Sequence, residues 1–421
     1  MAEIILNPTR ATTLRYQHIG WQVARLSVIG LGIAIPLSHS LTGLFCIGII
    51  LGLLFTGEAK AITRMFMTHP VTIAIVIFGC YLLISASYSH VDFSAMLNSL
   101  KKHERLLFIP FIFFALQNRP TRQAAVAGFI LSVLSTLCIA YYHAYFVPAV
   151  DANQIIFNRI ETSFIFAFTA FLLAHYAYQY PKFKTLCWVL VSLLVFNIVH
   201  FNSSRTGYVA LLALIAVLAW QRWRIKGLVS VSIFLAVILG SQLFLPKFFP
   251  YAPITAWTTH ITDPRILTRS EESIVNYESG NSKTSIGYRL LFIKWYPQLI
   301  LQAPMFGHGL GSTSEDFSHD NLPDISPLNW GNPHNYFLQV LFEFGVIGLL
   351  LFLTIVILMW RCQKDMFLPE RHISQGLLIV MLLGSCCDNL FYLSSTGHLF
   401  LFFSAYCLVR PFQLRQKLKS L

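Results

Sequence analysis

The sequence predicts an all-α, polytopic membrane protein. Of its 421 residues, 56% are hydrophobic and only 11% are charged, whereas soluble domains carry about 25% charged residues. The hydrophobic residues form long runs, and a helix needs roughly 17–25 such residues to cross a bilayer. A chain this apolar could not maintain a water-covered surface. The composition therefore excludes a soluble enzyme, a disordered protein and a secreted domain held together by disulfides.

About twelve segments have the length and composition of membrane-spanning helices. The first two are separated only by residues around Ser38–Ser40, which predicts a tight hairpin. The fourth is short, and we expect Pro110 to interrupt it. The predicted spans lie near 22–39, 41–57, 70–87, 104–117, 123–147, 159–179, 184–200, 206–221, 227–245, 334–360, 374–394 and 397–412.

Basic residues predict the orientation of these spans. Cytoplasmic connections are enriched in Lys and Arg, and an N-terminus in the cytoplasm makes every predicted inner connection basic. Twelve spans then return the C-terminus to the cytoplasm. The net charge of +12 follows from this arrangement, so it does not require a nucleic-acid partner. The basic positions are Lys60 and Arg64, Arg119 and Arg122, Lys182 and Lys184, Arg222 to Lys226, Arg361 to Arg371, and Arg410 to Lys419.

The same orientation divides the chain into three parts. Residues 1–245 hold spans one to nine, residues 246–333 form an outer loop, and residues 334–421 hold spans ten to twelve and a cytoplasmic tail. A structureless loop of this length would be unusual, so we expect short helices within it. Residues 285–301 predict an amphipathic helix, with Ile286, Leu290, Ile293 and Pro297 on its apolar face.

Two arginines on the predicted outer side are candidate anion ligands. Arg205 lies in the segment N-S-S-R-T-G (202–207), at the mouth of the eighth span. Arg289 follows Tyr288 on the predicted loop helix. A guanidinium group binds phosphate in a bidentate manner and is always charged. Alternatively, both arginines contact lipid headgroups at the membrane surface.

A histidine at the start of the tenth span is the candidate general base. The segment N-P-H-N-Y-F-L-Q (332–339) begins with a proline suited to a helix start, which predicts His334 in the first helical turn. Imidazole titrates near pH 6.5 and can accept a proton from a hydroxyl group. Alternatively, His334 only anchors the helix. Asn335, Tyr336 and Tyr288 are supporting candidates beside these residues.

Three other groups complete the candidates. Asp388 lies near the outer end of the eleventh span, where an acid is a functional candidate; its expected partner is Arg205 or another outer basic residue. The glycine-rich segment 304–311 matches neither phosphate-binding fingerprint, so we interpret it as a tight turn. Glu343, deeper in the tenth span, is interpreted as a structural polar contact.

No metal site is expected. Asp316, His319, Asp320 and Asp324 cluster in the outer loop, and carboxylates there could hold a divalent cation. The chain contains no D-x-D pair, however, and we interpret this cluster as a solvated acidic loop.

The order of these motifs resembles the O-antigen ligase family of bacterial envelopes. The resemblance rests on S-R-T-G before a span, an arginine on a loop helix, P-x-x-G-x-G-x-G, and P-H-N-Y-x-L-Q followed by E-x-G-x-x-G. It implies a GT-C-like fold with one long periplasmic loop, in the bacterial inner membrane. It also implies an inverting glycosyltransferase that uses neither a metal nor a cofactor.

The resemblance further implies the substrates and the roles of the residues. The donor is O-antigen on undecaprenyl diphosphate, and the acceptor is the outer core sugar of lipid A-core. The family's essential histidine falls on His334, its two arginines fall on Arg205 and Arg289, and Asp388 matches an acidic position. From charge alone, three basic residues are expected at the acceptor's phosphates; they are Lys101, Lys102 and Arg105.

Three other functions remain open from the sequence. An O-antigen polymerase and a protein O-oligosaccharyltransferase would use similar donors. A transporter of lipid-linked sugars belongs to a different class, and would more often show inverted repeats, helices broken at the bilayer midplane and polar groups through the membrane. In this chain the polar candidates gather on the predicted outer side, which favours an enzyme.

Overall fold

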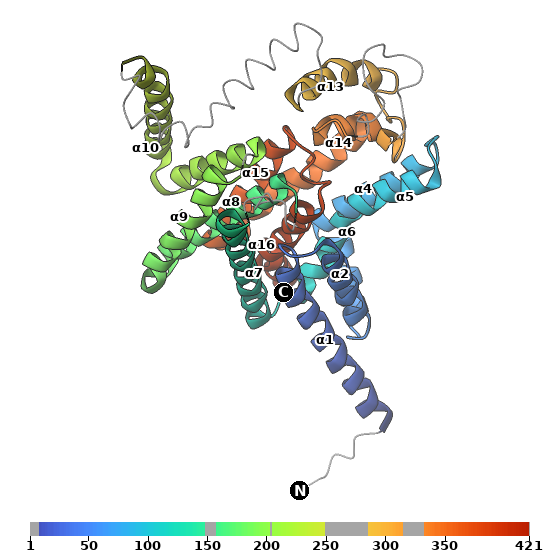
Figure 1. Cartoon of the computed structure of the whole chain (residues 1–421). Coiled ribbons are helices and arrows are strands. Elements are labelled where there is room, and N and C mark those ends of the chain that lie inside the picture. Colours follow the sequence, from blue (N-terminus) through green and yellow to red (C-terminus); the bar gives the residue numbers. More distant parts are fainter. Residues whose placement is uncertain (1–7, 148–156, 203, 249–284, 315–331, 421) are drawn as a thin grey trace.

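A computed structural model describes residues 8–147, 157–202, 204–248, 285–314 and 332–420. Within these ranges the chain is helical, with turns between helices and no strand (Figure 1). The helices are α1 (Pro8–Ala34), α2 (His39–Leu54), α3 (Ala59–Thr68), α4 (Pro70–Ala86), α5 (Phe93–His103), α6 (Arg105–Ala115), α7 (Arg119–Phe146), α8 (Arg159–Gln179), α9 (Lys184–His200), α10 (Arg205–Phe248), α13 (Ser285–Ile300), α14 (Tyr336–Cys362), α15 (Leu368–Ser385) and α16 (Ser394–Ser420), with short 3₁₀ turns at Pro181–Phe183, Ser312–Ser314 and Gln363–Asp365.

The predicted hairpin between the first two spans is confirmed. Ser38 caps α2 by accepting a hydrogen bond from the Leu41 backbone N–H. α1 and α2 then pack side by side, and a Cβ at Gly52 would lie only 2.9 Å from the Cα of Ala24. Small residues allow this close approach of two helix backbones inside a membrane.

Helix α8 lies at the centre of the bundle. Its most apolar stretch is 83% buried, compared with 22% for the span that contains α9. Phe164, Phe166 and Phe168 are fully buried, and the Phe168 ring lies 4.9 Å from that of Phe403 in α16. α8 also buries the polar side chains of Glu161, Ser163 and Thr169, and because such groups are costly in lipid they face other helices, which agrees with the central position of α8.

The number of spans is supported in part. Among the described residues, five helices are long and apolar enough to cross a membrane, or six if the pair α2 and α3, bent by 114°, counts as one broken span. These helices make the chain a multi-pass membrane protein. The total of twelve remains a prediction. α6 continues through Pro110, so our expectation that this proline interrupts the helix was wrong.

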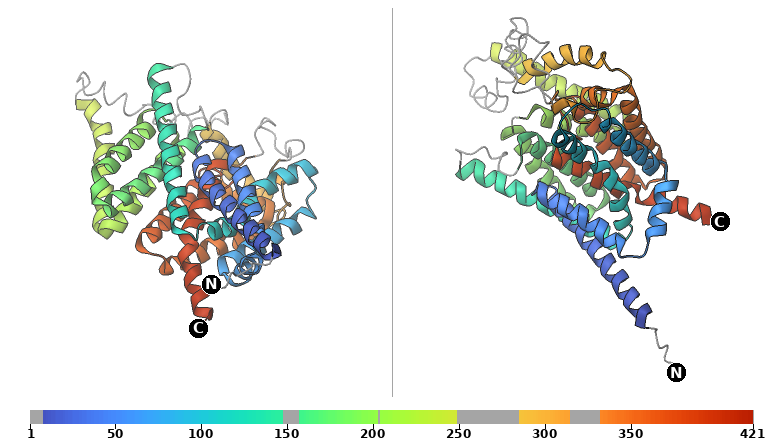
Figure 2. Two further views of the ribbon diagram at one scale, coloured as in Figure 1. Left: turned by 90° about the horizontal axis from the view of Figure 1, so that it is seen from below. Right: turned by 90° about the vertical axis from the view of Figure 1, so that its right-hand side faces the viewer.

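The predicted boundary between spans eight and nine is confirmed as a break within α10. Arg224 has φ 56° and ψ −138°, outside the helical region. This residue lies in the basic segment that separates the two predicted spans. Figures 1 and 2 show α10 changing direction along its length.

Helix α13 covers the start of α14 at one end of the molecule. Figures 1 and 2 place α13 beside α14, while the first turns of α1 lie at the opposite end. α14 has its own break at Gly345, where φ is 62°. The glycine-rich segment fits against this break. The N–H groups of His308 and Gly309 donate to the carbonyls of Phe342 and Glu343, each at 2.9 Å. These donors serve the helix break, which agrees with the interpretation of the segment as a tight turn.

Gly345→Ala is expected to destabilise the protein. The positive φ disfavours any side chain, and a Cβ would lie 2.7 Å from the Gly307 nitrogen. Backbone strain of this kind costs about 1–3 kcal/mol, so the midpoint of thermal unfolding in detergent should fall. Gly43→Ala is the matched control, since a Cβ there meets no atom within 4 Å. Equal midpoints for the two variants would contradict this explanation of the break.

Candidate active site

His334 lies just before α14. The helix begins at Tyr336, and the Asn335 side chain caps it by accepting hydrogen bonds from the N–H groups of Phe337 and Leu338. Our prediction that Pro333 starts the helix, with His334 in its first turn, was therefore wrong. Asparagine is among the strongest N-cap residues, and its side chain fixes the helix start three residues after the proline.

The backbone of His334 adopts an unusual conformation that turns its side chain toward α15. Its φ is 49°, in the left-handed region that few non-glycine residues adopt. The His334 N–H donates to the Asn332 side-chain oxygen at 2.9 Å, which holds this turn. Strained conformations of this type are concentrated at functional sites.

Asp388 is the partner of His334. It follows the end of α15, and its Oδ1 lies 3.3 Å from the His334 Nδ1. Oδ1 also accepts a hydrogen bond from the Asn389 N–H at 2.9 Å. The Asp388 side chain is 2% exposed, whereas that of His334 is 38% exposed. A buried carboxylate thus orients an imidazole whose other nitrogen can face a substrate.

Arg289 completes this group from α13. Its Nη2 lies 3.5 Å from the Asp388 Oδ2, and the side chain is 22% exposed. Within the described part of the chain, the Arg289 Nε is buried without a hydrogen-bond partner. The guanidinium therefore keeps donors available for an anion.

The direction of Arg289 follows from the face that α13 buries. Phe292, Tyr296 and Leu299 pack with Phe342 of α14, and Arg289 lies one turn before Phe292 on this side. Our predicted apolar face was wrong at Ile293 and Pro297, which are exposed. Because the arginine is on the buried side, it contacts Asp388, which favours the anion-ligand interpretation over headgroup binding.

Three side-chain amides, of Asn332, Gln339 and Asn389, form a hydrogen-bonded network next to Asp388. The Asn389 Nδ2 donates to the Asn332 Oδ1 at 2.8 Å and also to the Gln339 Oε1. The Gln339 Nε2 lies 3.3 Å from the Glu343 Oε1. The sequence analysis gave no role to Asn332 or Gln339. The signal present was their position inside the N-P-H-N-Y-F-L-Q segment, with Gln339 one turn after Asn335.

Glu343 ties three separate elements together. It is fully buried, and it accepts hydrogen bonds from Ser99 of α5 at 2.9 Å and from Thr313 of the 3₁₀ turn that follows the glycine-rich segment. The His103 Nε2 lies 3.8 Å away. These contacts agree with the structural role expected for Glu343. Tyr336 also belongs to the core, since it is 1% exposed and its hydroxyl faces His103.

Arg205 lies at the same end of the bundle, at the start of α10. Just before it, the Asn202 side chain donates to the Arg159 carbonyl in the first turn of α8. In that same turn, the Glu161 Oε1 accepts from the Ser395 N–H at 2.9 Å, and Ser395 follows Asp388 by seven residues. The ion pair that we predicted for Asp388 is formed with Arg289, another basic residue on the predicted outer side.

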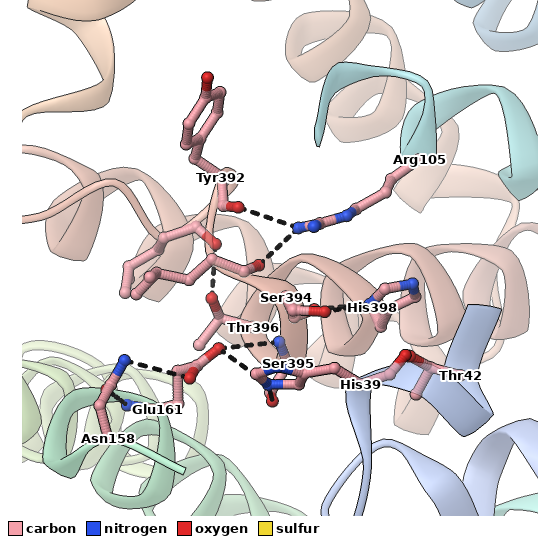
Figure 3. A network of polar contacts seen from close by, with 12 residues as sticks. His39, Thr42, Arg105, Asn158, Glu161, Tyr392, Ser394, Ser395, Thr396 and His398 are labelled. Carbon is pink, nitrogen blue, oxygen red and sulfur yellow. Dashed lines mark hydrogen bonds and ion pairs between the residues drawn. The ribbon is translucent and has the colours of Figure 1, made fainter. Parts of the chain in front are cut away.

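The three basic residues expected at the acceptor lie in different surroundings. Lys101 is exposed, and the Lys102 Nζ lies 3.9 Å from the centre of the Tyr392 ring. Burial lowers the pKa of Lys102 from its ordinary value. Arg105 donates to the carbonyls of Tyr392 and Leu393, at 3.0 and 2.8 Å, as Figure 3 shows.

Figure 3 also shows why Arg105 is fixed in place. Next to it, Glu161 joins α8 to Ser395 of α16, and the His39 Nε2 of α2 lies 2.8 Å from the Ser395 hydroxyl. Arg105 and this network hold α2, α6, α8 and α16 together near the site. Arg105 therefore has an evident structural role, whereas Lys101 remains available at the surface.

Some candidates lie outside the described positions. The side chain of Tyr288 is one, and the cluster Asp316, His319, Asp320 and Asp324 is another. Within the described ranges, no group of three His, Cys, Asp or Glu residues could hold a metal ion.

The fold and the site together define a helical, multi-pass membrane protein with a histidine, a carboxylate and an arginine in contact at one end. Such a group can accept a proton and bind an anion. Comparisons with known proteins agree with this class. Residues 189–353 match the family model described as O-Antigen ligase.

Three relatives are similar to parts of the chain. A Pseudomonas aeruginosa O-antigen ligase is 25% identical over 337 residues, covering 74% of this chain and 71% of that protein. A Rickettsia conorii protein, provisionally named a polysaccharide ligase, is 28% identical over 138 residues, covering 30% of this chain and 34% of its own length. A Haemophilus influenzae protein whose name assigns no function is 27% identical over 259 residues, covering 52% of this chain and 62% of its own length. The family model and these relatives thus make the chain similar to the O-antigen ligase family.

Proposed function

We propose that the protein is an O-antigen ligase. It transfers O-antigen polysaccharide from undecaprenyl diphosphate to the outer core sugar of lipid A-core, at the periplasmic face of the bacterial inner membrane. The observation that carries this proposal is the contact of Asp388 with both His334 and Arg289, at 3.3 and 3.5 Å. Segments far apart in the sequence here combine a base with an anion ligand.

In this reaction His334 is the general base. Asp388 accepts a hydrogen bond from the Nδ1–H of His334, which leaves the unprotonated Nε2 free to take the proton of the acceptor hydroxyl. The hydroxyl oxygen attacks the anomeric carbon of the donor sugar and forms the new glycosidic bond. Attack from the side opposite the leaving group inverts the anomeric centre.

The two arginines act on the leaving group. The bond between the anomeric carbon and the diphosphate oxygen breaks, and its electron pair leaves with undecaprenyl diphosphate. Negative charge develops on that oxygen, and preorganised cationic donors stabilise it most strongly in a site shielded from water. Arg289 and Arg205 supply these donors. We propose that this electrostatic stabilisation needs no metal ion and that no cofactor takes part.

The reaction is tested with purified protein, lipid-linked donor and lipid A-core. We expect transfer to the core sugar with inverted stereochemistry, undiminished by EDTA and independent of any ion gradient. Retention of configuration would contradict the mechanism. Loss of activity in EDTA that Mg²⁺ or Mn²⁺ restores would contradict the metal-independent step.

The same experiment separates the alternatives. An O-antigen polymerase would lengthen the donor chain in the absence of lipid A-core. A protein O-oligosaccharyltransferase would require a protein acceptor, and a transporter would move the donor without forming a bond. The ligase is favoured because the predicted topology has a single large outer loop.

Asp388→Asn is expected to slow transfer by as much as about 10⁴-fold. The amide keeps the shape of the side chain but favours the wrong tautomer of His334, as similar carboxylate–histidine pairs show. The turnover number should fall more than the donor affinity. Unchanged turnover in a folded variant would show that Asp388 does not act through the imidazole.

A further inference from the structure

Two adjoining cavities lie at the end of the bundle opposite His334. The first, of about 380 Å³, is lined by α7, α8, α15 and α16, and includes Arg119, Arg122 and Glu370. Glu370 lies in the first turn of α15, whereas Asp388 follows the last turn of that helix. The rise of an α-helix places the two carboxylates on the order of 27 Å apart. This cavity therefore does not belong to the site described above.

The first cavity carries charges of both signs. Arg119 and Arg122 supply two guanidinium groups, and Glu370 supplies one carboxylate. The Arg122 Cζ lies 5.8 Å from the centre of the Tyr406 ring, which also lines the cavity. Guanidinium groups bind phosphate through paired N–H donors, and a carboxylate accepts hydrogen bonds from an ammonium group.

The second cavity is apolar and opens beside the first. It measures about 410 Å³ and is lined by aliphatic side chains of α7, α8 and α9, among them Ile130, Leu173 and Leu190. The two cavities share Gln123, Tyr176 and Tyr180. The span containing α9 is only 22% buried, so this groove faces the lipid. Its surface suits a hydrocarbon chain.

We propose that the two cavities together bind one glycerophospholipid with an ethanolamine headgroup. The phosphate lies between Arg119 and Arg122, the ammonium group contacts Glu370, and one acyl chain occupies the apolar groove. Charge complementarity selects this lipid. If the headgroup had no ammonium group, the carboxylate of Glu370 would face the phosphate of the lipid directly, and the two negative charges would repel each other.

The test is a lipid titration of the full-length protein by native mass spectrometry. Phosphatidylethanolamine and phosphatidylglycerol with identical chains are compared in detergent. We expect the ethanolamine lipid to bind about tenfold more tightly, because a charge-assisted hydrogen bond to Glu370 is lost with the glycerol headgroup. Equal affinity, or tighter binding of phosphatidylglycerol, would overturn the proposal.

Variants separate the headgroup from the chain. Arg119→Gln combined with Arg122→Gln should weaken binding of the ethanolamine lipid about tenfold or more, whereas Arg64→Gln, an exposed arginine outside both cavities, should leave it unchanged. Glu370→Gln should remove the preference between the two lipids. Retained binding in the double arginine variant would refute the phosphate contact.

Two further measurements test the occupant as a lipid. Ala127→Phe fills the apolar groove without changing charge, and Ala127 is exposed, so the variant should fold. It should weaken binding of both lipids, and inorganic phosphate in excess should not displace them. Normal lipid binding by Ala127→Phe, or displacement by phosphate alone, would show that the cavity holds a free anion instead. These experiments measure lipid binding and not sugar transfer, so they test the lipid site independently of the proposed reaction.

Discussion

His334→Ala is expected to reduce transfer roughly 10²- to 10⁴-fold, the usual contribution of a general base. The residue contacts the buried Asp388, and more than a third of its side chain is exposed, so it can reach a substrate. The loss should appear in the turnover number measured with saturating donor. The variant should still insert into the membrane, so that the loss can be assigned to the reaction.

The backbone of His334 requires a second variant. Its φ of 49° is unfavourable for alanine but is better tolerated by asparagine. His334→Asn therefore keeps the conformation and a polar side chain while removing the base, and it should be as inactive as His334→Ala. His90→Ala, an exposed histidine between α4 and α5, is the matched control and should retain full activity. An active asparagine variant would assign the effect to backbone shape and end the role of the imidazole as a base.

Arg289→Gln is expected to lower turnover roughly 10²- to 10³-fold, as does loss of a donor to a developing negative charge. Arg289→Lys should also be impaired, by about tenfold or more, because an ammonium group lacks the paired donors of guanidinium. Both variants should weaken binding of the free diphosphate lipid as well.

The control for Arg289 lies on the same helix. Lys294 is exposed on another face of α13, so Lys294→Gln keeps the helix and removes one positive charge near the membrane surface. If Lys294→Gln and Arg289→Gln lowered activity equally, non-specific electrostatic attraction between the positive helix and the diphosphate-linked donor would explain both losses. Full activity of Arg289→Lys would likewise contradict bidentate recognition of the diphosphate.

The sequence predicted the features that depend on local pattern. Apolar length predicted the membrane class, the basic segment around Arg224 predicted the break in α10, and the helix near 285–301 was found within one residue of its observed end. These features follow from composition and periodicity over short stretches. The motif around His334 predicted the candidate base for the same reason.

Features set by tertiary packing could not be predicted in this way. The spacing of aliphatic residues in α13 predicted that Ile293 is buried. The helix instead buries the face that carries Phe292, because Phe342 of α14 lies opposite that face. Asp388 was expected to pair with Arg205 or another outer basic residue, and the docking of α13 makes Arg289 that partner. At the start of α14, two start signals lie within three residues, and the side-chain cap of Asn335 fixes the helix start.

The most direct test of the proposed site is a cryo-electron microscopy structure with the diphosphate-linked donor bound. We predict that the diphosphate lies within about 4 Å of the Arg289 guanidinium, the distance of a direct ion pair. The anomeric carbon of the donor should lie on the side of His334. A donor bound elsewhere, with Arg289 still paired to Asp388 and no sugar near His334, would contradict the account.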